Sequence, residues 1–185
     1  MKIQTVFGAA ALCVALAGPA AAQQNQISVK KDFDDWTVRC YAVDSPSPCE
    51  MIEVLANNTN KQRVLTVSIA YVPSVNRHTL LVGVPLGVAL AKGIVIAAGD
   101  YKSPVLKYRR CDINGCYVEM VIDEAFVQGL SRADSATAQV ADGDGKVVPI
   151  TFSLKGFSAA HDEMADLSRQ KAKALPAAPA EAPKP

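Results

Sequence analysis

Two closely spaced pairs of cysteines constrain the fold of this chain more than any other feature. Eight residues separate Cys40 from Cys49, and four separate Cys111 from Cys116. Four cysteines permit three pairings. We favour the two local ones, because each pair brackets a turn that should bring neighbouring strands within bridging distance. Each bridge is then expected to contribute about 2–4 kcal/mol, with the smaller loop at the low end.

Two other roles for these cysteines are a four-cysteine zinc site and a redox-active pair. Zinc sites usually have tighter C-x2-C spacing, and redox pairs usually form C-x-x-C at the start of a helix. Neither spacing occurs here. We therefore predict structural disulfides and no metal or other cofactor. Four free thiols or one bound zinc in an intact mass measurement would contradict this.

The N-terminus has the three parts of a secretory signal peptide. Lys2 precedes an apolar run over 3–16, and small residues follow up to Ala22, where we expect cleavage. The fifth cysteine, Cys13, leaves with the signal, so an even number remains in a compartment that permits disulfides. The residue directly after the cleavage site is Gln23 and not a cysteine that could be acylated, so a lipid anchor is not expected. We predict a periplasmic, outer-membrane-associated or secreted protein.

Length and charge exclude several classes of function. What remains after residues 1–22 has the size of one domain. Without Lys2 its acidic and basic residues balance, which argues against nucleic acid and against a polybasic membrane anchor. The run 79–98 is nearly long enough to span a membrane. Lys92, Pro85 and several glycines divide it into strand-sized pieces, so we predict no stable membrane insertion.

Short apolar segments separated by turn residues predict an all-β domain. Within 63–72 the heavier alternate side chains, Leu65, Val67, Ile69 and Tyr71, should face the core. A polar lead is expected over 23–32, helices over 123–133 and 161–173, and a flexible Pro/Ala-rich tail over 175–185. The strands are expected at 36–41, 49–55, 63–72, 79–84, 93–98, 105–111, 116–122, 137–140 and 147–154.

Four stretches, taken in order, resemble the invasion-associated locus B family of exported bacterial proteins. They are FDDWTVRC at 33–40, VPLGV at 84–88 with Gly93 after it, the Cys111-x4-Cys116 hairpin, and SLKGFSAA at 153–160. The resemblance implies one domain over 33–160, an immunoglobulin-like antiparallel β-sandwich with one or two short helices, followed by a C-terminal helix and tail over 161–185. It also implies an envelope or secreted location and, for some members, a role in entering host cells. His161 stands where the family pattern suggests an apolar residue, which leaves the start of the last helix open.

The sequence contains no recognisable catalytic constellation, and we predict that the protein is not an enzyme. His78 and His161 lie in no nucleophile or acid motif, and we interpret them as separate surface residues. A basic cluster, Lys107, Arg109 and Arg110, is either a solvated strand end or a weak contact site for an acidic partner. Trp36, the sole tryptophan, is expected to cap the core.

Two classes of function remain. The first is an interaction protein of the cell envelope, with one face of the sandwich binding a protein or surface partner in the envelope or on a host cell. The second is a carrier of a small molecule or lipid in an apolar cavity lined by 80–98. A large exposed apolar patch favours the first, and a ligand retained by gently extracted protein favours the second.

Overall fold

The structure, a computed structural model, describes residues 26–174. The predicted signal peptide and the predicted tail lie outside these residues. Nine strands follow one another in the chain before the first α-helix, α1 (Glu124–Ser131), and two more precede the second, α2 (Phe157–Ala174). The strands are β1 (Ile27–Phe33), β2 (Trp36–Tyr41), β3 (Cys49–Ala56), β4 (Arg63–Val72), β5 (Arg77–Val84), β6 (Ile94–Ala98), β7 (Tyr101–Lys102), β8 (Arg110–Asp112), β9 (Gly115–Ile122), β10 (Ser135–Ala141) and β11 (Val147–Ser153).

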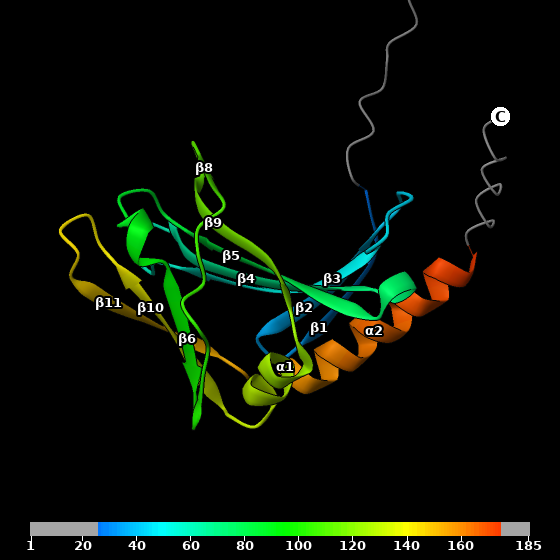
Figure 1. Ribbon diagram of the computed structural model, residues 1–185. Coiled ribbons are helices and arrows are strands. Elements are labelled where there is room, and N and C mark those ends of the chain that lie inside the picture. Colours follow the sequence, from blue (N-terminus) through cyan, green and yellow to red (C-terminus); the bar gives the residue numbers. More distant parts are fainter. Residues whose placement is uncertain (1–25, 175–185) are drawn as a thin grey trace, which may run out of the picture.

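The strands form two antiparallel sheets, which confirms the predicted all-β fold. A seven-stranded sheet has the order β1-β2-β3-β4-β5-β9-β8, and a four-stranded sheet has the order β11-β10-β6-β7. Figure 1 shows the four-stranded sheet and α2 on the same side of the long sheet, under its two ends. We call the covered side of the seven-stranded sheet its inner face and the other side its outer face.

The core lies against the inner face. In β4 the predicted side chains, from Leu65 to Tyr71 at every second position, are buried there. Trp36 is fully buried as predicted, with its ring edge-on to Phe157 at 5.1 Å between centroids. Its indole N–H donates to the backbone carbonyl of Ser153 at 3.1 Å. This bond ties β2 to the end of β11, so Trp36 joins the two sheets as well as filling the space between them.

Helix α2 begins four residues before the predicted start. Gly156 precedes it with φ of +80°, and a side chain at this position would run into the backbone carbonyl of Phe33. From there Phe157, Ala160 and Met164 recur at helical spacing and are buried against β1 to β4. The helix therefore docks through an apolar stripe that starts before His161.

Two other segments differ from the sequence predictions. Residues 27–32, expected in a polar lead, form most of β1, whose adjacent lysines, Lys30 and Lys31, suit an edge strand. Residues 105–111 do not form one strand, because Leu106 pairs with Ile94 of the four-stranded sheet before the chain crosses to β8. As predicted, the run 79–98 is divided into short pieces, namely β5, a short 3-10 turn and β6. Among the described helices, none is long and apolar enough to cross a membrane.

Helix α1 is shorter than the predicted 123–133 but begins as expected. The side chain of Asp123 caps it by accepting the backbone N–H of Phe126 at 2.9 Å.

Candidate functional site

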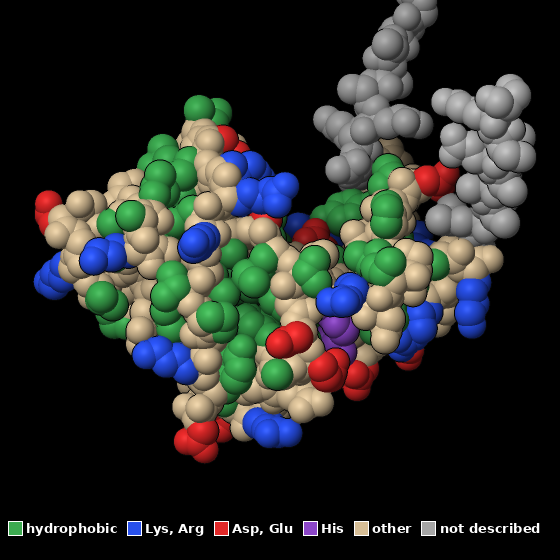
Figure 2. Space-filling view, viewed as in Figure 1, with side chains coloured by type: hydrophobic (Ala, Val, Ile, Leu, Met, Phe, Trp, Pro, Cys, Tyr) green, Lys and Arg blue, Asp and Glu red, His purple; other side chains and the backbone are tan. Residues whose placement is uncertain are grey.

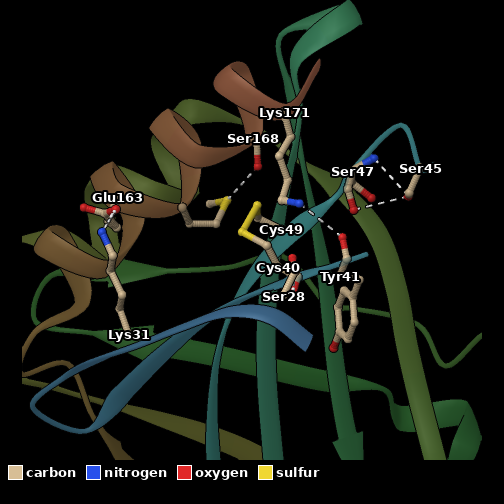
Figure 3. Close-up of a disulfide and its surroundings, with 11 residues drawn as sticks. Ser28, Lys31, Cys40, Tyr41, Ser45, Ser47, Cys49, Glu163, Ser168 and Lys171 are labelled. Atoms are coloured by element: carbon tan, nitrogen blue, oxygen red, sulfur yellow. Dashed lines mark hydrogen bonds and ion pairs between the residues drawn. A yellow bond between two sulfur atoms is a disulfide. The ribbon is translucent and has the colours of Figure 1, made fainter. Parts of the chain in front are cut away.

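Both disulfides join directly opposed residues of neighbouring strands. Cys40 is bonded to Cys49 and Cys111 to Cys116, each with 4.0 Å between Cα atoms, which is the local pairing that the sequence favours. Figure 3 shows the first bridge on the inner face beneath α2, where Lys171 reaches over it toward the carbonyl of Tyr41. The second lies at the β8–β9 edge, where Cys111 is exposed. The cysteines therefore hold strands together and leave no thiol free among residues 26–174.

The outer face of the seven-stranded sheet carries a hollow that is open to solvent. Within residues 26–174, no helix or strand covers it in Figure 1, and Figure 2 shows it hollowed between the β8–β9 hairpin and the far end of the sheet. The hollow has a volume of about 440 Å³. Its lining comes from β3, β4, β5 and β9 and from the segment before β8: Glu50, Ser68, Ala70, Thr79, Leu80, Leu81, Arg109, Glu119, Met120 and Val121.

Glu50 is the centre of a polar network on this face. Its carboxylate accepts from Arg39 Nε at 2.8 Å, from the Tyr41 hydroxyl and, through its other oxygen, from the Ser68 hydroxyl. Burial and the hydrogen bond to Glu50 raise the pKa of Tyr41 to about 12, so its hydroxyl keeps its proton at neutral pH. Three strands thus contribute to one fixed, charged group in the middle of an open sheet.

Arg109 of the predicted basic cluster lines the hollow, and both Arg109 and Arg110 are paired with acids. Arg110 Nε lies 2.9 Å from Glu119, and its Nη1 lies 2.7 Å from Asp112. Arg109 Nε is 3.7 Å from the same Glu119. The Arg110 guanidinium also lies 4.3 Å from the centre of the Tyr117 ring, a cation–π distance. Two of the three basic side chains of the cluster therefore already have acidic partners within the protein.

The two histidines meet, contrary to the prediction that each is a separate surface residue. His78 Nε2 on β5 and His161 Nε2 on α2 are 3.0 Å apart. Tyr71 flanks His78, and Phe157 stacks beside His161. Burial, and then the nearby His161, lower the pKa of His78. Sequence reasoning missed this pair because 83 residues separate its members.

A buried acid, Glu53, lies where the two sheets meet. Its Oε1 accepts the backbone N–H of Ser153 at 3.1 Å, while its Oε2 is buried without a hydrogen-bond partner. Burial raises the pKa of Glu53 to about 7. The sequence could have predicted this burial. Cys49, Met51 and Glu53 occupy alternate positions of β3, so they point to the same, inward-facing side.

Two other expectations concern bound groups. Among residues 26–174, no three His, Cys, Asp or Glu side chains gather in a way that could hold a metal ion. The stretch proposed to line a carrier cavity, 80–98, turns its inward side chains into the common core. Those side chains are Leu80, Val82, Val84, Ile94, Ile96 and Ala98.

Comparison with known proteins agrees with the resemblance seen in the sequence. The family model described as "Invasion associated locus B (IalB) protein" matches residues 36–165. This chain belongs to the IalB family. The match begins at Trp36 in β2 and ends in α2, so it covers every strand except β1, both disulfides and the histidine pair.

Individual relatives of this IalB family member share less than a third of its residues over the matched region. The "Invasion protein B homolog" of Brucella abortus (strain 2308) is 29% identical over 143 residues, which are 77% of this chain and 82% of the relative. A protein of the same description in strain 9-941 matches equally. The crystal structure of invasion associated protein b from Bartonella henselae has a TM-score of 0.67 at 19% identity. It covers 77% of this chain and 99% of that one, and shows that the two proteins share a fold.

Proposed function

We propose that this IalB family member is a non-enzymatic, exported protein of the cell envelope that acts by binding a protein or surface partner through the outer face of its seven-stranded sheet. The observation that carries the proposal is the make-up of that face. Charged groups anchored around Glu50 and Glu119 lie among exposed aliphatic side chains on a hollowed, uncovered sheet. Two of those aliphatic residues, Val54 and Val121, are each 53% exposed.

The inner face cannot bind a partner in this way, because its side chains are buried in the core and against α2. On the outer face the main charged groups already have partners within the protein, and apolar surface between them is open. A binding partner can therefore bury Val54 and Val121 without also burying an unpaired charge. Burial of an unpaired charge has a large desolvation free energy and would weaken binding.

Export is supported by the N-terminal signal and by two disulfides, which persist in oxidising compartments. We propose cleavage near Ala22 and release of the mature chain into the periplasm, onto the outer membrane or into the medium. The names of the relatives associate them with invasion. Contact with a host cell is accordingly the form of binding that we propose for a surface-exposed mature chain.

Protease added to intact cells, and to cells whose outer membrane has been opened, tests the location. Digestion of intact cells would place the domain on the surface and support host or environmental binding. Digestion only after opening would confine it to the periplasm and direct the search to an envelope partner.

Binding of the purified mature protein to isolated envelopes or host cells tests the face. We expect Val54→Lys and Val121→Lys to weaken binding at least ten-fold. Val147→Lys is the matched control, because Val147 is an equally exposed valine on the other sheet. Equal binding by all three variants would contradict the proposed face. A ligand carried by gently extracted protein would instead support the carrier function.

A further inference from the structure

The only two histidines of the chain face each other across the boundary between β5 and α2. Packing holds both rings, since Tyr71 lies 5.0 Å from His78 and Phe157 lies 6.5 Å from His161, between ring centroids. We propose that His78 and His161 form a binding site for a divalent transition metal, with Cu²⁺ as the preferred ion.

The separation of the two nitrogens fits this role. Imidazole nitrogens bound at about 2.0–2.1 Å in adjacent positions of a square-planar ion lie about 2.9 Å from each other. The two Nε2 atoms are 3.0 Å apart, at hydrogen-bonding distance, so an ion bound to both would take the place of the proton between them at nearly the same separation. Square-planar coordination by nitrogen and oxygen is typical of Cu²⁺ and Ni²⁺, and Cu²⁺ binds most tightly of the first-row divalent ions.

The surroundings also suit a metal. Asp162 Oδ1 lies 3.3 Å from Nδ1 of His161, and a carboxylate at the second ring nitrogen is the usual partner of a metal-binding histidine. The negative charge of Glu124 faces His78 from α1, while Arg169 of α2 adds a positive charge nearby. His161 keeps 17% of its side chain exposed, so water can fill the other coordination positions. Figure 2 shows histidine at the surface beside acidic side chains.

Few other groups of this protein compete for the ion. The sequence has no third histidine, and the four cysteines of the described residues are in disulfides. An ion held by both histidines would link the long sheet to the C-terminal helix. Metal binding should therefore raise the thermal midpoint of unfolding, because the ion binds the folded chain better than the unfolded one.

The test uses the mature chain, purified without a histidine tag and titrated with Cu²⁺ or Zn²⁺ by calorimetry. We expect one Cu²⁺ per chain, weaker Zn²⁺ binding, an electron paramagnetic resonance spectrum with two nitrogen ligands, and a higher thermal midpoint. His78→Gln and His161→Gln should each weaken Cu²⁺ binding at least ten-fold. His161→Gln carries the test if His78→Gln does not fold.

Glu163→Gln is the matched control on the same helix. Glu163 pairs with Lys31 at 2.6 Å and so contributes to helix docking without touching either histidine. We expect this variant to bind Cu²⁺ like the wild type. The proposal is overturned if the wild type binds no Cu²⁺, if the double histidine variant binds it equally well, or if Glu163→Gln weakens binding as much as His161→Gln.

Discussion

The two faces of the seven-stranded sheet differ in what their side chains contact. The inner face is covered by the four-stranded sheet and α2, and its buried acid, Glu53, is tied to the backbone of Ser153. Along the same strands, every second side chain points to the outer face instead. There the Glu50 carboxylate is hydrogen-bonded to three neighbours, and Val54 and Val121 are half exposed. We infer from this difference that the free energy of folding comes mainly from burial of the inner face. The outer face is then available for the proposed binding.

The largest loss of stability is expected from Trp36→Ala on the inner face. The substitution removes a fully buried ring, its contact with Phe157 and the hydrogen bond to Ser153, and should cost about 3–5 kcal/mol. Urea unfolding followed by circular dichroism measures this. Trp36→Phe, which keeps an aromatic ring, should cost much less. Equal losses in both variants would contradict the role given to packing.

Next in size is the removal of the disulfide beneath α2. Replacing both Cys40 and Cys49 by alanine should cost about 3 kcal/mol, and replacing Cys111 and Cys116 about 2 kcal/mol, because the second bridge closes a shorter loop. The first bridge is also buried in the core, whereas Cys111 is exposed. Thermal unfolding of the two double variants ranks the bridges, and the reverse order would break the comparison.

A smaller, pH-dependent effect is expected at Glu53. Its folded-state pKa is raised from the usual 4.5 to about 7, so folding favours the protonated acid. The wild type should therefore lose stability as the pH rises from about 4.5 to 7, and stay at the lower level above that.

Glu53→Gln removes this loss. The variant should be more stable than the wild type at pH 8 by on the order of 2 kcal/mol, and nearly equal to it at pH 4.5. Urea unfolding at both pH values measures the difference. Parallel pH profiles for the two proteins would show that Glu53 does not titrate in this window.

The smallest change in stability is expected on the outer face. Val54→Lys and Val121→Lys alter exposed side chains, and the free energy of unfolding should change by less than about 0.5 kcal/mol. The same urea assay checks this. A loss of several kcal/mol in either variant would show that the outer face also supports the fold, and would remove the contrast between the faces.

Local patterns in the sequence predicted the strands with a regular alternation of apolar side chains and the helix with a recognisable N-terminal capping residue. The alternation from Leu65 to Tyr71 located β4, the cysteine pairs gave the strand neighbours, and Asp123 marked the start of α1. Strand β1 was missed because an exposed edge strand can be mostly polar and resembles a loop in composition.

The candidate sites were harder to predict, because each is assembled from distant segments. The network around Glu50 draws Arg39 from β2 and Ser68 from β4, and depends on the register of three strands. The histidine pair depends on where α2 lies across the sheet. No local spacing encodes either arrangement, so both required the tertiary structure.

Site-specific photo-crosslinking in living cells tests most directly whether the outer face binds the partner. A photoreactive amino acid is placed singly at Val54, Val121 or Val147, which are exposed to similar extents on the two sheets. We predict one discrete crosslinked product from Val54 and from Val121, and none from Val147. Products from Val147 alone, or equal products from all three positions, would contradict the account.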